Sequence, residues 1–306
     1  MALVYSLQRA LELGVMGGAC LAFGVFDGVH LGHACILDAA ISQARAKSTS
    51  SVVLTFDVDP DDVIRPGAVK KIMSDERRIG SLSQTGVDAV VLLPFNNDFA
   101  KLSPDDFLKK VFGGHVPLAL NVGLDFRFGY KGQGTVDTLL QWGQANGTEV
   151  VVHELECSGG APITATRIRG LLAEGNVEEA AKLLGRLYSI EGRVLRGRQE
   201  GREMGFSTAN LNIEPSLRVL GAGVYGGYAV VRDTTYKAAI SVGVSPTFQD
   251  ASAVCEVHIL DFEGDIYDTE IEVFFAAWLR PMRKFDDVDE LITTVMGNIE
   301  WCRNNL

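Results

Sequence analysis

Residues 24–33 constrain the fold of this chain more than any other segment. They read Gly-Val-Phe-Asp-Gly-Val-His-Leu-Gly-His, follow an apolar run at residues 20–23, and precede apolar residues at helical spacing from Ala34 to Ala44. This pattern predicts a buried strand that turns sharply into a helix, with glycines where the backbone needs unusual dihedral angles. A helix N-terminus binds phosphate, and imidazoles beside it donate hydrogen bonds to phosphoryl oxygens. The segment therefore predicts a site for a nucleoside triphosphate.

Short β-branched runs alternate with helical patterns between residue 15 and about residue 160. We expect strands at 51–56, 88–94, 118–123 and 149–154, and helices that begin after Ser74, Ser103 and Thr135. Such alternation predicts an α/β domain with a parallel sheet covered on both faces. Ligands of such sheets bind at the carboxyl ends of the strands, which is where residues 24–33 fall.

The pattern changes after two further helices at 166–172 and 177–184. Residues 189–195, 223–231, 236–242, 254–262 and 271–279 read as strands separated by glycine turns. They predict a small antiparallel β-barrel or sandwich. The chain then ends in a helix whose apolar face runs from Val288 to Cys302. We expect two domains, at residues 1–185 and 186–306, as the length of 306 residues also favours.

Charge and cysteine content limit the partners and the compartment. A net charge of −11 argues against nucleic acid or an anionic membrane as a partner. The five cysteines are scattered and lack the spacing of zinc ligands, which favours reduced thiols. The sequence contains neither a long apolar span nor a signal-peptide pattern. We therefore expect a cytoplasmic protein that binds small molecules.

Residues 24–33 resemble the HxGH signature of the nucleotidyltransferase superfamily, and their longer form resembles prokaryotic FAD synthetases, which are bifunctional riboflavin kinase/FMN adenylyltransferases. Residues 123–129 and 164–169 resemble that family's second and third adenylyltransferase segments. A lone histidine pair is as well explained by burial or helix capping, but three segments in order favour the family. The resemblance implies a Rossmann-like nucleotidyltransferase fold with catalytic His30 and His33. It assigns nucleotide or phosphate binding to Gly24, Phe26, Asp27, Gly28, Asp125, Arg127, Thr166 and Arg169.

A glycine-rich segment at residues 197–210 supplies a second candidate site. Its glycines let backbone N–H groups surround phosphates, although glycines also suit hairpin turns. Thr208 and Asn210 offer oxygen ligands for Mg²⁺. The segment resembles the riboflavin kinase loop, and residues 223–225 and 243–248 match the same module. The implied ATP-binding loop consists of Gly197, Gly201, Arg202, Gly205, Thr208 and Asn210.

Glu256 is the candidate base of this second site. It shares a strand face with His258, opposite the apolar residues 255 and 257. An acidic residue in such a place is ordinarily a solvated outer position. The pattern Glu-x-His-x-x-Asp formed with Asp261 resembles the kinase family, in which the glutamate is the general base for the ribityl 5′-hydroxyl. Arg280 and Phe285 match the family's flavin side, although Arg280 also suits a structural cation near a chain reversal.

The resemblance implies two successive reactions that use ATP and Mg²⁺. Riboflavin is phosphorylated to FMN, with Glu256 as the base. The FMN phosphate then attacks the α-phosphorus of a second ATP, and pyrophosphate and FAD are released. That nucleophile is already anionic, so positioning and charge stabilisation suffice. Flavins and ATP are the expected partners.

Three positions depart from the family pattern. Asp59 replaces a histidine that would meet ATP phosphate, Ala165 replaces a serine, and Ser207 replaces the proline before Thr208. The first two affect the adenylyltransferase more than the kinase, because they remove phosphate donors or repel the phosphate. Two alternatives therefore stay open. One is a riboflavin kinase with an impaired adenylyltransferase domain, and the other is a non-catalytic flavin-binding sensor.

Overall fold

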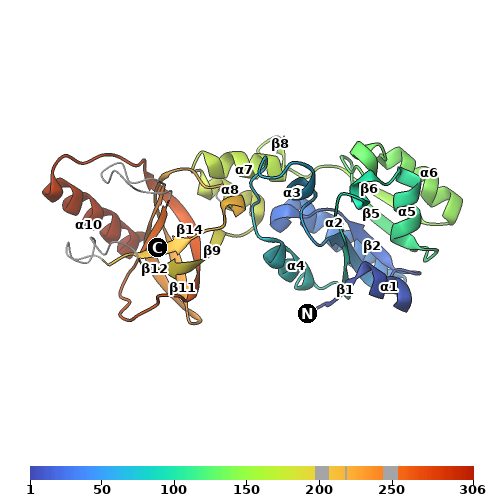
Figure 1. The fold of residues 1–306 in the computed structure, drawn as a ribbon, viewed down its shortest axis with the longest axis horizontal. Helices are drawn as coiled ribbons and strands as arrows, with labels where there is room; N and C mark the ends of the chain where they lie inside the picture. The colour runs from blue at the N-terminus through green and yellow to red at the C-terminus, as the bar shows by residue number, and fades with distance from the viewer. Residues whose placement is uncertain (197–206, 218, 244–253) are drawn as a thin grey trace. The chain divides into compact units, whose positions relative to one another are not determined.

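The chain forms two compact units, drawn as a ribbon in Figure 1. This computed structural model describes residues 1–196, 207–217, 219–243 and 254–306. The first unit comprises Met1–Val69 and Met73–Ala165, and the second comprises Lys70–Ile72 and Thr166–Leu306. Helices α7 (Ala165–Ala173) and α8 (Val177–Leu184) thus group with the second unit. The assignment of one activity to residues 1–185 and the other to 186–306 stays a prediction.

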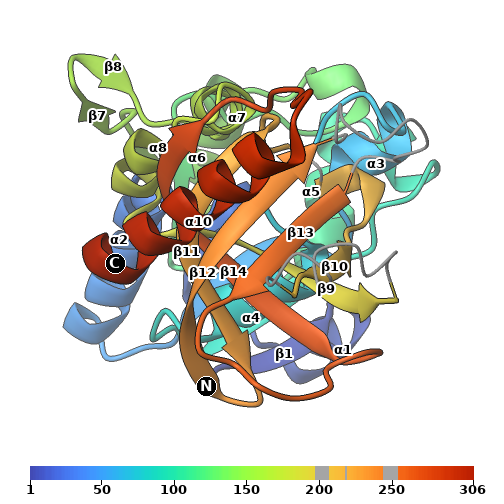
Figure 2. The same ribbon diagram turned by 90° about the vertical axis from the view of Figure 1, so that its left-hand side faces the viewer.

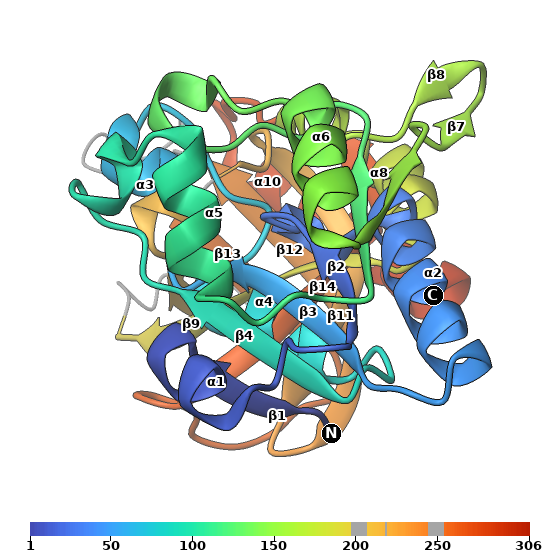
Figure 3. The same ribbon diagram turned by 90° about the vertical axis from the view of Figure 1, so that its right-hand side faces the viewer.

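A six-stranded parallel sheet forms the centre of the first unit, as expected (Figure 3). Its strand order is β1-β4-β3-β2-β5-β6. The strands are β1 (Leu3–Ser6), β2 (Cys20–Phe23), β3 (Ser51–Phe56), β4 (Ala89–Leu93), β5 (Ala119–Gly123) and β6 (Glu149–His153). From β2 the chain goes first to β3 and later returns on the other side at β5. The strand order therefore reverses between β2 and β5, and ligands of open α/β sheets bind at such a point.

Helices cover both faces of this sheet (Figure 3). One face carries α1 (Leu7–Leu13), α5 (Pro104–Phe112) and α6 (Val136–Asn146). The other carries α2 (Leu31–Ala46) and α4 (Asp75–Ser83). The predicted caps Ser74, Ser103 and Thr135 each accept a backbone N–H at the start of their helix.

Five short elements of the first unit were not expected from the sequence. They are β1, α1, α3 (Pro60–Ile64) and the hairpin of β7 (Cys157–Ser158) and β8 (Ala161–Pro162). Single 3₁₀ turns complete the unit at Asp27–Val29, Phe99–Lys101 and Tyr130–Gly132. All of these elements are too short to show a clear hydrophobic period in the sequence.

Six described strands of the second unit close into an antiparallel barrel, which decides between the two predicted β-folds (Figure 2). The barrel order is β10-β13-β12-β11-β14-β9. The strands are β9 (Tyr188–Leu195), β10 (Ala209–Asn212), β11 (Gly223–Val231), β12 (Thr234–Gly243), β13 (Val254–Ile259) and β14 (Glu270–Arg280). The sequence did not predict β10, whose four residues begin at the end of the glycine-rich segment. This short strand closes the ring, because it pairs with both β9 and β13.

The terminal helix α10 (Val288–Asn305) packs against the barrel at β11 and β12 (Figure 2). Its Ile299 and Cys302 are buried against Leu260. The predicted apolar face is wrong at Val288, whose side chain is 61% exposed. That residue occupies the first turn of α10, which the cluster of buried side chains does not reach. Within the described part of the chain, no helix combines the length and apolar character needed to span a membrane.

Candidate functional sites

The predicted turn lies between β2 and α2, where its buried Asp27 and Gly28 belong to the 3₁₀ turn Asp27–Val29. His30 has extended backbone angles and is the N-cap of α2. Its Nδ1 accepts a hydrogen bond from the backbone N–H of His33 at 3.3 Å. Neutral His30 therefore carries its proton on Nε2, where the ring is a donor. Capping and phosphate binding are thus compatible roles of the same imidazole.

His33 stacks on His30, with ring centroids 3.5 Å apart and an interplanar angle of 17°. Burial, and then the charge of His30, hold the pKa of His33 well below its ordinary value. Its Nδ1 is enclosed and has no hydrogen-bond partner among the described residues. Two stacked imidazolium ions would repel each other, so His33 is neutral at neutral pH. An anion bound beside the pair would favour its protonation.

Close backbone packing explains the glycines of the turn. Phe26 has a left-handed φ of 61°, and its buried ring meets His33 edge-on with centroids 5.2 Å apart. A Cβ atom at Gly24 would lie 3.1 Å from the Phe26 ring. A Cβ atom at Gly32 would lie 3.2 Å from both the His30 ring and the carbonyl oxygen of Ile163. Unusual φ values of this kind cluster at functional sites.

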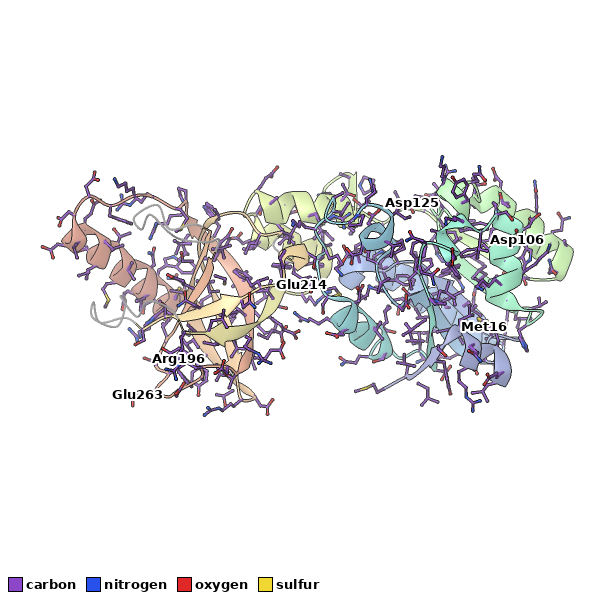
Figure 4. All side chains as sticks on the ribbon, in the orientation of Figure 1. Met16, Asp106, Asp125, Arg196, Glu214 and Glu263 are labelled. Atoms are coloured by element: carbon purple, nitrogen blue, oxygen red, sulfur yellow. The ribbon has the colours of Figure 1, made fainter. Side chains whose placement is uncertain are left out.

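The second predicted segment follows β5, the neighbour of β2 in the sheet. The ring of Phe126 lies 4.8 Å from that of Phe23, the last residue of β2. The fold therefore brings this segment beside the turn at the reversal of the strand order. Asp125 and Arg127 are exposed in this loop, and Figure 4 labels Asp125.

The third predicted segment begins α7. Ala165 is the first residue of that helix, and Thr166 and Arg169 lie on its first turns. A hydrogen bond of 3.4 Å joins Nη2 of Arg169 to Oγ1 of Thr166. Both residues belong to the second unit, whereas the turn belongs to the first. Their predicted contact with phosphate stays a prediction.

Asp59, the most notable departure from the family pattern, is the N-cap of α3. Its Oδ1 accepts the backbone N–H of Asp61 at 2.9 Å, and Pro60 follows at the first helical position. Burial raises the pKa of Asp59 above its ordinary value. The carboxylate thus has a structural role in starting a short helix.

Arg78 is a residue that the sequence reading missed. Its side chain is 2% exposed and lies within α4. Nη1 donates to the carbonyl of Val25 at 3.1 Å and to Oγ1 of Thr55 at 2.8 Å. Nη2 donates to the carbonyl of Phe56 and to Oδ1 of Asp75, at 2.9 and 2.8 Å. Helical spacing places Arg78 on α4, but only the fold reveals that it is buried beneath the ends of β2 and β3.

The candidate base of the barrel lies across from the end of the glycine-rich segment. In the register of β10 and β13, Asn210 pairs directly with Glu256. Directly opposed residues share a face, with Cβ atoms about 4.5–5.5 Å apart. Both side chains are half-buried, while their strand neighbours Cys255 and Val257 are buried, as the predicted alternation requires. The predicted residues Gly197, Gly201, Arg202 and Gly205 lie outside the described residues, as do residues 244–248.

His258 and Asp261, the other members of the Glu-x-His-x-x-Asp pattern, contact different parts of the second unit. Nδ1 of His258 lies 2.9 Å from the carbonyl oxygen of Ser207, so that this nitrogen donates to the residue before Thr208. Asp261 accepts a hydrogen bond of 2.9 Å from Arg303 near the end of α10. His258 thus holds the residue before Thr208, whereas Asp261 ties the segment just after β13 to α10.

The predicted flavin-side residues Arg280 and Phe285 lie together. The guanidinium carbon of Arg280 is 5.7 Å from the Phe285 ring centroid, and that of Arg283 is 4.4 Å away. Burial, and then the charge of Arg283, lower the pKa of Arg280. The Arg280 Nη1 also donates to the carbonyl of Pro281 at 3.2 Å. The bond to Pro281 fits the alternative of a structural cation, and the flavin-side role of Arg280 and Phe285 stays a prediction.

Two family models match the chain on either side of the α7–α8 region. The FAD synthetase model matches residues 15–167, and the riboflavin kinase model matches residues 184–306. A histidine turn on a parallel sheet, followed by a riboflavin kinase barrel, defines a two-unit flavin-nucleotide enzyme. Relatives described as bifunctional riboflavin kinase/FMN adenylyltransferase extend over both units. The chain belongs to the bifunctional riboflavin kinase/FMN adenylyltransferase family.

The relatives are similar along most of their length. The protein of Listeria monocytogenes is 34% identical, with 89% of this chain and 87% of the relative covered. The protein of Escherichia coli K12 is 31% identical, with 94% of this chain and 91% of the relative covered. A crystal structure from Streptococcus pneumoniae, described as a macrolide-efflux protein, has a TM-score of 0.84 at 31% identity and covers 94% of both chains. Its description belongs to that protein, and the likeness here is in sequence and fold.

Proposed function

We propose that this chain converts riboflavin to FAD in two ATP-dependent steps, with phosphorylation in residues 186–306 and adenylylation in residues 1–185. The observation that carries the proposal is the cross-strand pairing of Glu256 with Asn210. This pairing puts a carboxylate beside the end of a phosphate-binding loop, where flavin binding alone needs no base. The histidine turn on the parallel sheet supplies the second reaction.

Glu256 orients the ribityl 5′-hydroxyl and accepts its proton in the first step. The hydroxyl oxygen attacks the γ-phosphorus of ATP, the bond from that phosphorus to the β,γ-bridging oxygen breaks, and ADP leaves. Asn210 lies across from the base, and His258 holds the carbonyl of Ser207 beside Thr208. These contacts hold the loop end and the base on the same outer face of the barrel.

Thr208 and Asn210 are the residues that would hold Mg²⁺. Hydroxyl, amide and carboxylate oxygens are ligands that Mg²⁺ prefers, and the pairing of Asn210 with Glu256 gathers oxygen atoms of this kind. Within the described ranges, no cluster of three or more His, Cys, Asp or Glu side chains offers a competing transition-metal site. When bound, Mg²⁺ would neutralise charge on the phosphates.

The second step needs positioned donors but no base. A phosphate oxygen of FMN attacks the α-phosphorus of ATP, and the bond to the α,β-bridging oxygen breaks to release pyrophosphate. We assign the stabilisation of the developing charge to His30, His33, Arg169 and the backbone N–H groups at the start of α2. The predicted nucleotide contacts of Asp125, Arg127 and Thr166 belong to the same proposal.

Asp59 and Ala165 favour the second candidate, a riboflavin kinase with an impaired adenylyltransferase. Asp59 places a carboxyl group where the family has a phosphate-binding histidine. Its cap on α3 ties that carboxyl to the backbone, so it stays in place. The non-catalytic sensor is a weaker candidate, because binding alone requires neither the base Glu256 nor the oxygen ligands of Thr208 and Asn210.

A product time course distinguishes the three candidates. Purified protein is incubated with riboflavin, ATP and Mg²⁺, and the flavins are separated by chromatography while pyrophosphate is measured in parallel. FAD with pyrophosphate supports the bifunctional enzyme. FMN alone supports the kinase with an impaired adenylyltransferase, and unchanged riboflavin supports the sensor. Chelation of Mg²⁺ by EDTA should stop product formation, and added Mg²⁺ should restore it.

A further inference from the structure

We propose that Arg78 is a positioning residue for the adenylylation of FMN. This inference rests on the proposed function of the first unit. Arg78 touches neither of the two histidines in any contact described above, and it lies on α4, outside all three adenylyltransferase segments. Two of its four hydrogen bonds nevertheless reach backbone carbonyls that precede the histidine turn and the segment with Asp59.

The contacts of Arg78 join the ends of two strands. Val25, whose carbonyl accepts from Nη1, directly precedes Phe26 and the 3₁₀ turn. Phe56, whose carbonyl accepts from Nη2, is the last residue of β3 and leads to Asp59. Thr55 completes the network, since its Oγ1 accepts from Nη1 and donates to the Val25 carbonyl at 3.2 Å. One planar side chain therefore sets the spacing between the histidine turn and the segment that carries Asp59.

The charge of Arg78 matters as well as its hydrogen bonds. Among the four acceptors described above, Asp75 carries a formal charge, and its ion pair with Arg78 measures 2.8 Å. The positive charge also acts on Asp59. Burial raises the pKa of Asp59, and the charge of Arg78 lowers it by a smaller amount. Arg78 thus offsets part of the negative charge that Asp59 brings toward the phosphate site. A buried cation at this place helps a chain with Asp59 accept a triphosphate.

Stability alone is a poor explanation for this side chain. Burying a guanidinium removes its hydration, and apolar residues of similar volume often serve a core as well or better. What an apolar residue cannot do is fix two carbonyl groups at once. The rigid fork of arginine binds two acceptors in one plane, whereas lysine is a single flexible point charge. The choice of arginine at this position therefore fits a role in holding the geometry of the turn.

The test is Arg78→Lys, with Arg77→Lys on the same helix as the matched control. We measure kcat and the KM for ATP with FMN as the substrate, and riboflavin phosphorylation by the same preparation as an internal standard. Arg78→Lys should lower kcat/KM for adenylylation by about 10- to 100-fold, because small misplacements of a positioned group have effects of this size. The KM for ATP should rise, and kinase activity should stay within about twofold. Arg77→Lys should change neither reaction.

Partial unfolding would lower kcat without raising the KM of the folded fraction, so the KM separates positioning from loss of structure. An unchanged KM for ATP together with an unchanged kcat overturns the proposal, and so does a lower kcat that merely follows the fraction of folded protein. Asp59→Asn supplies a second test when it is made both alone and together with Arg78→Gln, which removes the positive charge. If Arg78 offsets the charge of Asp59, Asp59→Asn should recover part of the activity lost in Arg78→Gln. Absence of FAD formation by the unmodified chain would instead refute the proposed function.

Discussion

The parallel-sheet unit and the barrel unit build their sites in different ways. In the first, the two histidines are three residues apart and are oriented by a strained turn and a helix N-cap. In the second, Asn210 and Glu256 come from different strands and meet through the barrel register. A site at the ends of strands depends on local backbone, whereas a site on a sheet face depends on strand pairing. Substitutions at the site of the first unit should therefore lower both stability and activity. Substitutions at the site of the second unit should lower activity and leave stability nearly unchanged.

Glu256→Gln tests the barrel half of this comparison and has the largest expected effect. Loss of the base should slow riboflavin phosphorylation by about 10²- to 10⁴-fold, with FMN adenylylation unchanged. The melting temperature should hardly move, because Glu256 is half-buried on the outer barrel face. Rates with riboflavin and with FMN are measured separately, and Glu270→Gln, at an exposed position of β14, is the control. Normal FMN formation by Glu256→Gln would refute its role as the base.

His30→Asn makes the corresponding test in the parallel-sheet unit. Asparagine is a good N-cap, so it preserves a bond to the His33 N–H while it removes the imidazole donor. We expect adenylylation to fall by about 10²- to 10³-fold, as for the loss of one transition-state donor, with the kinase unchanged. His30→Ala, which also removes the cap, should in addition destabilise the unit by about 1 kcal/mol in thermal or denaturant unfolding. Equal unfolding of the two variants would contradict the capping role.

His258→Val tests whether the loop end is held by the hydrogen bond to Ser207. Loss of one bond of about 1 kcal/mol should raise the KM for ATP in the kinase reaction about fivefold, and leave adenylylation unchanged. His258→Gln, which keeps an N–H donor, should recover part of the affinity. An unaltered KM in His258→Val would show that other contacts hold Thr208.

Asp59→Asn has the smallest expected effect and depends on pH. Burial raises the pKa of Asp59, so the folded chain binds this proton more tightly than the unfolded chain. This proton therefore stabilises the folded chain fully at pH values below the pKa of Asp59 in the unfolded chain. The stabilisation is lost as pH rises through the pKa of Asp59 in the folded chain. Above that pKa the carboxylate repels phosphate, so the KM for ATP in adenylylation should rise with pH. Asp59→Asn keeps the cap and should lower the KM at neutral pH by a few-fold, as expected when one repulsion of about 1 kcal/mol between like charges is removed.

The KM for ATP is measured at several pH values in both proteins, because groups other than Asp59 also respond to pH in both. The difference between the two profiles isolates Asp59. Parallel profiles would show that Asp59 does not repel the phosphate, which would remove the main structural reason to expect an impaired adenylyltransferase.

Much of the fold was predictable because its signals are local. The caps Ser74, Ser103 and Thr135 each act within one helical turn, and the structure confirms all three. The alternation around Glu256 likewise follows from the geometry of one strand. β10 escaped prediction because four residues with two asparagines carry little strand signal of their own. Its place in the barrel is decided by its partners β9 and β13.

By itself, the sequence determined the histidine turn, the parallel-sheet class, the antiparallel character of the second half and the face of Glu256. These properties depend on residue type and on spacings within one element. Only the tertiary structure decided the closure of the barrel, the opposition of Asn210 and Glu256, the cap role of Asp59 and the burial of Arg78. Those properties depend on which distant segments meet, and hydrogen bonds across such contacts leave no periodic trace along the chain.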